Sequence, residues 1–286
     1  MGKVGLVLEG GAMRGMYTMG ILDAFIENGI VADGTVGVSA GAVFGCNYKS
    51  RQAGRALRYN MQYCRDPRYC SFRSLIKTGD LFGADFCYRE LPEELDLFDN
   101  EAYEKNPMPF YVVCTDVDTG KAVYHQCKTA RGDDLLWMRA SASLPLAARM
   151  VEVGGQRLLD GGIADPIPYA FSESLGFDRN IVILTRPFGY VKKKNGAMPL
   201  IAHRYKNHPE FVEAVANRHL IYNRELAEVR KAEKEGRALC FRPENDLPIG
   251  RVSHDPEALK RVYEIGHNQA LKRLDETKDF IEEAKK

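Results

Sequence analysis

The sequence predicts an α/β fold in which a mostly parallel central sheet is covered by helices on both faces. Two observations carry this prediction. Short runs of aliphatic and β-branched residues alternate with helical patterns through the first 50 residues, and runs of the same kind recur near residues 110 and 180. A strand, a helix and another strand in succession favour parallel pairing, because the helix returns the chain to where the next strand can run in the same direction.

The N-terminal elements follow directly from the pattern. Residues 3–8 form a compact apolar run typical of a strand buried on both faces. Apolar residues at helical spacing over 16–26 predict a helix, with Gly29 placed where that helix would end. Residues 35–38 predict a second strand and residues 40–48 a second helix.

The middle of the chain is richer in strands. Residues 109–115 predict a strand, and residues 121–127 are expected to pair with it across a turn at 118–120. Residues 150–153 and 156–159 are typical of a hairpin around two glycines, and residues 180–185 predict another buried strand.

The last third is mainly helical. A 3,4 spacing of apolar residues predicts a long helix over 209–235 that stops at Gly236, and residues 238–241 are a last strand candidate. Asp255 as cap and Pro256 in the first turn begin a final helix that runs toward Lys286. We expect one domain over residues 1–286, with a motif-bearing part at about 3–190 and a helical C-terminal part at about 205–286.

Composition narrows the class of protein. The 286-residue chain is 45% hydrophobic and 28% charged, and its 40 Lys and Arg against 39 Asp and Glu give a net charge of +1. This balance excludes a disordered acidic protein and a strongly basic nucleic-acid coat, and no nucleic-acid-binding motif accompanies it. Seven cysteines without a CxxC pair, no export signal and no apolar stretch of about 20 residues favour buried thiols and a cytoplasmic location.

The first chemical motif is Gly37-Val38-Ser39-Ala40-Gly41, between a predicted strand and a predicted helix. A serine placed in this way fits the tight turn called a nucleophile elbow, in which glycines avoid Cβ clashes and the hydroxyl is exposed. The helix behind it would add a partial positive charge that stabilises an alkoxide. The same pattern also fits an ordinary helix start capped by Ser39, and short matches of this kind are common by chance.

The second motif, EGGAMRG over residues 9–15, follows the first strand and opens the first helix, so its N–H groups would point at an anion. A Rossmann-type nucleotide site is the alternative. Two features weaken it: Ala12 stands where a glycine would admit pyrophosphate, and no acidic residue ends the second strand to bind a ribose. Beside a serine elbow, the loop would instead donate N–H groups to an oxyanion formed at Ser39.

The third motif is Asp160-Gly161-Gly162, after an apolar strand. A hydrolytic serine needs a base, and conventional α/β-hydrolases use a histidine late in the chain. The histidines, at positions 125, 203, 208, 219, 254 and 267, lie in no motif. His219 is on the apolar stripe of its helix, as expected of a core histidine, and His254 adjoins a helix cap. Asp160, flanked by glycines that let the backbone bend, is the better candidate.

These three motifs, in this order and spacing over residues 9–162, resemble those of the bacterial patatin-like phospholipase family of serine lipid acyl hydrolases. The resemblance implies a patatin-like fold with C-terminal helices and a catalytic dyad of Ser39 as nucleophile and Asp160 as base, without histidine, metal or cofactor. It also implies an oxyanion hole in the loop Gly10, Gly11, Ala12, Met13, Arg14 and Gly15, an elbow of Gly37, Val38, Ala40 and Gly41, and a DGG motif completed by Gly161 and Gly162. Ala12 is a departure, since the family often has three successive glycines, but its N–H is kept.

The implied chemistry is hydrolysis of an acyl ester through an acyl-Ser39 intermediate, with a phospholipid, lysophospholipid or other lipid ester as substrate. Partial burial would raise the pKa of Asp160 above the usual value of about 3.9 and make it a better base. The alternative function is a protein that binds lipid without cleaving it.

Charge is unevenly distributed along the chain. Residues 49–77 carry eight Lys and Arg and one acid, and residues 80–104 carry nine acids and one Arg. We interpret these stretches as a solvated surface on which the acidic stretch folds against the basic one. A third stretch, residues 179–209, has seven Lys and Arg and no acid. Its Lys192-Lys193-Lys194 run is either solvated or in contact with anionic lipid, as at the inner face of a membrane. The sequence leaves this choice and the oligomeric state open.

Overall fold

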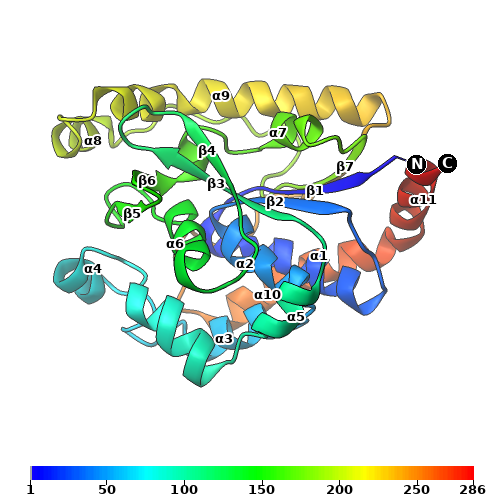
Figure 1. Ribbon diagram of the computed structural model, residues 1–286, viewed down its shortest axis with the longest axis horizontal. Helices are drawn as coiled ribbons and strands as arrows, with labels where there is room; N and C mark the ends of the chain where they lie inside the picture. The colour runs from blue at the N-terminus through cyan, green and yellow to red at the C-terminus, as the bar shows by residue number, and fades with distance from the viewer. Residues whose placement is uncertain (1) are drawn as a thin grey trace.

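Eight strands form one sheet in the computed structural model, which describes residues 2–286 (Figure 1). They are β1 (Val4–Leu8), β2 (Gly34–Val38), β3 (Phe110–Asp116), β4 (Ala122–Gln126), β5 (Val151–Val153), β6 (Gln156–Asp160), β7 (Arg179–Ile183) and β8 (Ala238–Phe241). Strands β8, β7, β1, β2 and β3 lie side by side in that order and are parallel, whereas β4 and β6 pair antiparallel with β3. Strand β5 pairs antiparallel with β6. The predicted strands and their mostly parallel arrangement are confirmed.

The helices are α1 (Gly15–Glu27), α2 (Ala40–Lys49), α3 (Arg55–Tyr63), α4 (Phe72–Thr78), α5 (Asn100–Lys105), α6 (Gly132–Ser141), α7 (Tyr169–Ser174), α8 (Met198–Arg204), α9 (Pro209–Lys234), α10 (Pro256–Lys272) and α11 (Leu274–Lys285). Two single turns of 3-10 helix, η1 (Ala12–Arg14) and η3 (Gly161–Ile163), and a π-helical segment, η2 (Phe86–Leu95), complete the chain.

Alternate residues of the central strand face two separate cores, one on each side of the sheet. Leu6 and Leu8 of β1 belong to the core beneath α1, α2 and α10, and Val7 belongs to the core beneath α9. Figure 1 shows α7 and α9 on one side of the sheet and α1, α2, α3 and α10 on the other. Helices therefore cover both faces, as the sequence predicts.

Strand β3 brings two distant segments end to end. Its residues Val113 and Thr115 each pair with β4 on one side, so β2 and β6 both lie on its other side. Val38, the last residue of β2, pairs with Val113, and Asp160, the last residue of β6, pairs with the next residue, Cys114. The two strands run toward each other along β3, and their carboxyl ends meet. The residues that follow Val38 are thereby placed beside Asp160.

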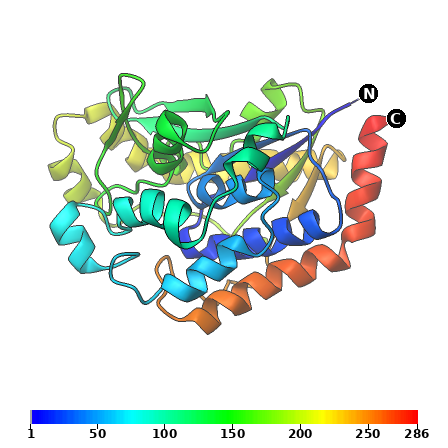
Figure 2. The same ribbon diagram turned by 60° about the horizontal axis from the view of Figure 1, so that its bottom comes forward.

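Helix α10 packs closely along α1 (Figure 2). A Cβ on Gly20 would lie 2.1 Å from the carbonyl oxygen of Tyr263, and a Cβ on Gly266 would lie 2.0 Å from that of Tyr17. Both glycines are needed for this approach of the two backbones. The N–H of Gly2 donates to the carbonyl of Ala284, so the two ends of the described chain lie together.

The C-terminal helix predicted over 255–286 is interrupted, which corrects that prediction. The backbone leaves helical geometry at Arg273 (φ −111°, ψ 20°), and α11 starts in a new direction (Figure 2). The Arg273 guanidinium donates to the carbonyl of Cys240 and to Glu276, which fixes the bend. The amphipathic pattern continues through the bend, so the sequence alone does not reveal it.

The basic stretch 49–77 and the acidic stretch 80–104 fold against each other, as we interpreted. Asp96 pairs with Arg55 and Arg58, and Glu90 pairs with Arg68. The stretch is only partly solvated, because Lys49 and Arg55 are buried. All seven cysteines are free thiols, and all except the partly buried Cys87 are buried.

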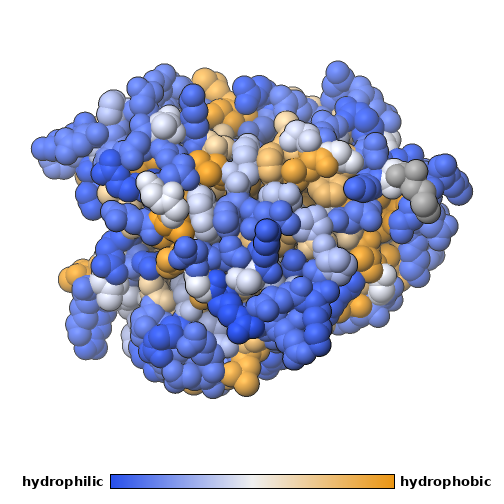
Figure 3. Space-filling model, viewed as in Figure 1, coloured by the Kyte–Doolittle hydropathy of each residue, from blue (hydrophilic) through white to orange (hydrophobic). Residues whose placement is uncertain are grey.

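The face of the molecule in Figure 3 is mostly hydrophilic, with small apolar patches scattered over it. Among residues 2–286, no helix combines the length and the apolar character that crossing a membrane requires.

Candidate active site

Ser39 occupies a strained turn between β2 and α2. Its backbone has φ 54° and ψ −118°, outside the regions that L-residues favour, and such a conformation costs of order 1–3 kcal/mol. The Ser39 N–H donates to Ser141 Oγ at 3.0 Å, and Ser141 Oγ donates to the carbonyl of Val113 at 2.6 Å. The Ser39 side chain makes no capping hydrogen bond to α2. The interpretation of Ser39 as a helix cap is therefore wrong, and its hydroxyl is free for another partner.

Close backbone approaches explain the glycines around this turn. A Cβ on Gly37 would lie 2.5 Å from the carbonyl oxygen of Gly41, and a Cβ on Gly41 would lie 2.4 Å from that of Leu8. A Cβ on Gly10 would lie 2.7 Å from the Cβ of Ser39. The elbow and the glycine loop are thus packed against each other at the carboxyl ends of the parallel strands β2 and β1.

Asp160 is 1% exposed, and its two carboxyl oxygens differ in their hydrogen bonding. Oδ1 accepts the N–H of Gly162 at 2.8 Å, which pins the DGG turn. Oδ2 is buried and has no hydrogen-bond partner among residues 2–286. Burial raises the pKa of Asp160, and the neighbouring Ser39 hydroxyl and Arg218 guanidinium oppose that rise. Asp160 is therefore a carboxyl with one fixed oxygen and one free oxygen, close to the serine.

The glycine loop offers three N–H groups. Within residues 2–286, the N–H groups of Gly10, Gly11 and Ala12 donate to no acceptor, whereas Met13 donates to the carbonyl of Arg251 and Arg14 to that of Gly11. The N–H of Gly15 is also used inside its helical turn. Of the six loop residues predicted for an oxyanion hole, the first three have free donors and the last three do not. Ala12 adopts φ 50°, a left-handed conformation that suits glycine better.

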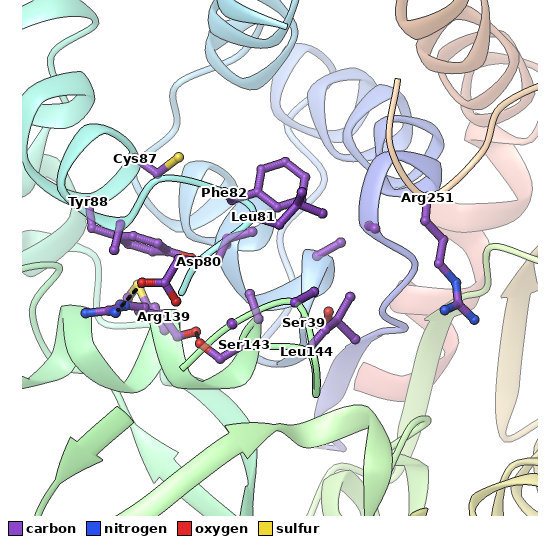
Figure 4. Close-up of a pocket in the computed structure, with 18 of the residues that line it drawn as sticks. Ser39, Asp80, Leu81, Phe82, Cys87, Tyr88, Arg139, Ser143, Leu144 and Arg251 are labelled. Carbon is purple, nitrogen blue, oxygen red and sulfur yellow. Dashed lines mark hydrogen bonds and ion pairs between the residues drawn. The ribbon is translucent and has the colours of Figure 1, made fainter. Parts of the chain in front are cut away.

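A large apolar cavity opens beside Ser39, with a volume of about 450 Å³. This is within the range of small-molecule sites, about 300–1,000 Å³. Ser39 lines it together with apolar residues that include Val43, Tyr59, Phe82, Leu91, Met138 and Ile201. Figure 4 shows Ser39 and Leu144 on one side of this cavity, Leu81 and Phe82 on another, and Arg251 beyond Ser39. The charged residues of its lining are Arg55, Asp80, Arg139, Arg218 and Arg251. Asp80 is bound by Arg139 and Arg149.

A second, much smaller cavity lies against the glycine loop, and Ser39 lines this one too. Its volume is about 40 Å³, and its lining contains Glu9, Asp160 and several Arg and Lys side chains. Ser39 therefore lies where an apolar cavity and a charged cavity meet.

No histidine within residues 2–286 lines either cavity. His125, His208 and His267 pair with Asp134, Asp118 and Glu27. His254 contacts the carbonyl of Cys64. His219, expected in the core, is only partly buried and contacts the carbonyl of Ala216.

One cluster of possible metal ligands lies away from Ser39. The ligand atoms of His125, Cys127 and Asp134 are within 4.8 Å of one another. Burial raises the pKa of Cys127 well above its usual range. Both Asp134 oxygens already accept hydrogen bonds, from the His125 ring and from Thr129.

The residues that shape these cavities could not be recognised in the sequence. The basic side chains of the small cavity come from Arg14 and from four positions after residue 180, and they share no sequence motif. Lys192, considered above as a surface residue, is partly buried in this cavity, whereas Lys193 and Lys194 are exposed. A basic stretch of seven Lys and Arg without an acid was the one signal that pointed there.

The part of the chain that carries Ser39 and Asp160 matches a known protein family. The model of the patatin-like phospholipase family covers residues 6–171, and a second model, a domain of unknown function (DUF6363), covers residues 208–282. The fold also resembles that of VipD from Legionella pneumophila, with a TM-score of 0.48 and 12% identity over 97% of this chain and 67% of that one.

Among curated proteins, an uncharacterized NTE family protein of Mycobacterium tuberculosis is 31% identical over 185 residues, which is 63% of this chain and 48% of that protein. The uncharacterized protein YjjU of Escherichia coli is 29% identical over 65% of this chain and 53% of its own length. Lysophospholipase NTE1 of Coccidioides immitis is 26% identical over 97% of this chain and 18% of its own length. The chain spans about half or less of the length of these relatives. Because more than half of the chain matches the family model, the protein belongs to the patatin-like phospholipase family.

Proposed function

We propose that the protein is a serine acyl-ester hydrolase that acts on lipid esters of the phospholipase A, lysophospholipase or esterase type. One observation carries the proposal: a strained serine with an uncapped hydroxyl lies beside a buried carboxyl whose Oδ2 has no partner, at the mouth of a 450 Å³ apolar cavity. Membership of the family supports it.

The reaction begins with attack of Ser39 Oγ on the acyl carbonyl carbon while its proton passes to Asp160 Oδ2. A raised pKa favours this transfer, because it brings the carboxylate closer in basicity to the group it deprotonates. Negative charge develops on the carbonyl oxygen, where the free N–H groups of Gly10, Gly11 and Ala12 stabilise it.

Collapse of this intermediate breaks the ester bond. The alcohol leaves with the proton held by Asp160, and the acyl group stays on Ser39. Water then attacks the acyl carbon, gives its proton to Asp160, and the second collapse returns that proton to Ser39 and releases the fatty acid. Asp160 ends each cycle as a carboxylate.

Two alternatives were open from the sequence. A nucleotide-binding site is disfavoured, because the loop packs on Ser39 and borders an apolar cavity that offers no ribose-binding carboxylate at the end of β2. A protein that binds lipid without cleaving it would have the same cavity. Only a measurement of serine reactivity or ester cleavage distinguishes it from the hydrolase.

Labelling with a fluorophosphonate ester followed by intact-protein mass spectrometry tests the proposal. We expect one adduct on the wild-type protein and none on Ser39→Ala. Ser143→Ala is the matched control, since Ser143 also lines the large cavity but binds the carbonyl of Arg139, and it should keep the adduct.

Hydrolysis of a short-chain p-nitrophenyl ester should be lost in Ser39→Ala at an unchanged melting temperature. An adduct that persists in Ser39→Ala, or full turnover by that variant, would contradict a Ser39 nucleophile. A wild-type protein that is folded yet neither labelled nor active would favour the lipid-binding alternative.

A further inference from the structure

The small cavity beside Ser39 carries an excess of positive charge. Five basic side chains line it: Arg14, Arg186, Lys192, Arg218 and Arg251. The acidic residues in its lining are Glu9 and Asp160. Its volume of about 40 Å³ leaves room for two or three waters or one tetrahedral anion.

Four of these cations form no close ion pair with any residue of the described chain, 2–286. Arg186 pairs with Asp246, but Arg14, Lys192, Arg218 and Arg251 make no ion pair within 4.0 Å among residues 2–286. The Nε of Arg14 is buried without any hydrogen-bond partner, and the Nε of Arg218 donates to the carbonyl of Gly162. Arg14, Lys192 and Arg218 are partly buried, and Arg251 is exposed. A charge that is partly withdrawn from water is normally paired, because it loses hydration without compensation.

Glu9 carries the opposite charge but uses its carboxylate oxygens in other hydrogen bonds. Its Oε2 accepts the N–H and the hydroxyl of Thr185, and its Oε1 accepts the hydroxyl of Tyr222. Lys192 instead lies over the ring of Tyr222, with Nζ 4.6 Å from the ring centre. Burial and repulsion by the nearby Arg218 guanidinium lower the pKa of Lys192 to about 7.

We propose that this cavity binds a phosphate group carried by the alcohol part of the ester, so that the substrate is a phospholipid or lysophospholipid rather than a neutral ester. The inference rests on the proposed function for its link to Ser39. Ser39 lines both cavities, so an ester bond placed at Ser39 sends its acyl chain into the apolar cavity and its alcohol part toward the cations. Arginine and lysine are the side chains that recognise phosphate oxygens.

The cluster is assembled largely from outside the patatin-like match, which ends at residue 171. Lys192 follows β7, Arg218 lies on α9 and Arg251 follows β8. Arg218 and Arg251 fall within residues 208–282, the segment matched by the domain of unknown function. That segment would thus take part in substrate binding.

The first test measures binding of inorganic phosphate by calorimetry, with Ser39→Ala so that no turnover intervenes. Arg251→Ala and Lys192→Ala, added to this background, are expected to weaken binding at pH 6 by about ten-fold or more, the scale of a lost charge-assisted hydrogen bond. Lys193→Ala is the matched control, because Lys193 is the exposed neighbour of Lys192 and does not line the cavity. Equal affinity in all four proteins would overturn the site.

The second test separates a lipid phosphate from free phosphate. Wild type, Arg251→Ala and Lys193→Ala are compared for kcat/KM on a lysophosphatidate and on a monoacylglycerol with the same acyl chain. We expect the ratio of the two values to fall at least about ten-fold in Arg251→Ala and to stay unchanged in Lys193→Ala. A ratio that does not move while inorganic phosphate still binds would overturn the headgroup assignment. If wild type cleaves neither substrate, the proposed hydrolase fails, and the calorimetric result still decides whether the cavity binds phosphate.

Discussion

The two cavities that meet at Ser39 differ in size, chemistry and origin in the chain. The large one is mostly apolar, and its lining comes mainly from α2, α3, η2 and α6 and from the segments 80–84 and 142–148. The small one is lined by Arg and Lys that lie mostly after residue 180. An apolar wall selects by length and shape, and a charged wall selects by charge. The contrast teaches that the acyl side and the alcohol side of an ester would be recognised by separate parts of the protein.

Asp160→Asn should have the largest effect, because it acts where the two cavities meet. The amide keeps an oxygen for the N–H of Gly162 but cannot take the serine proton, so turnover should fall by about 10²-fold or more on any ester. The melting temperature should stay near that of wild type. Turnover and melting are measured on one preparation, and retained turnover would rule out Asp160 as the base.

Val43→Phe should affect the large cavity alone. Val43 lies one turn along α2 from Ser39, and a larger side chain there shortens the space for an acyl chain. Each excluded methylene is worth about 0.8 kcal/mol, so loss of two lowers kcat/KM for a long-chain ester by roughly ten-fold or more. An acetyl ester should be hydrolysed at nearly the wild-type rate. Equal losses on both esters would show that the acyl chain lies elsewhere.

The small cavity should respond to pH through Lys192, whose pKa of about 7 is set by burial and by Arg218, with Arg251 and Arg14 acting in the same direction and Glu9 opposing them. The pKa is lowered, so the cation is present below pH 7 and lost above it. Affinity for sulfate, whose own charge is constant, should fall about ten-fold from pH 6 to pH 8 by linkage. Lys192→Arg should flatten this profile, because arginine stays charged. A flat profile in the wild type would remove Lys192 from the anion site.

Ala12→Gly is the mildest change, because it relieves strain without removing a donor. Ala12 has φ 50°, and we expect glycine there to stabilise the fold by about 1 kcal/mol or less while turnover is nearly unchanged. Gly10→Ala is the informative contrast, since its Cβ would lie 2.7 Å from that of Ser39 and should cost most of the activity. Thermal melting and ester hydrolysis check both variants. Loss of turnover in Ala12→Gly would mean that Ala12 acts through its methyl group.

Much of the fold could be predicted because its strands are short, apolar and bounded by turns. The hairpin at Gly154-Gly155 and the pairing of β3 with β4 are local, so spacing alone predicts them. The helices of residues 55–141 were not predicted, since their apolar faces are mixed with Arg, Asp and Glu that pair with one another. The prediction of one domain stays a prediction, supported by the packing of α10 on α1.

For the candidate site, the motifs point to Ser39, Asp160 and the glycine loop, and the structure brings these residues together through β3. Sequence could not say which of the six loop N–H groups are free, because that depends on the carbonyl of Arg251, far along the chain. Nor could it place Lys192 and Arg218 in one cavity, since their meeting depends on how α9 lies across the sheet.

The hydrogen bond from Arg218 to the carbonyl of Gly162 has a consequence for how such a protein can diversify. It fastens α9 to the turn that carries Asp160, so the reacting groups and the cations are held in one frame although different stretches of sequence encode them. With the proposed roles, substitutions at Lys192 or Arg251 would change which alcohol is accepted while β2, β3 and β6 keep the serine and the carboxyl in place. The preference for the alcohol leaving group could then change in evolution while Ser39 and Asp160 stay the same.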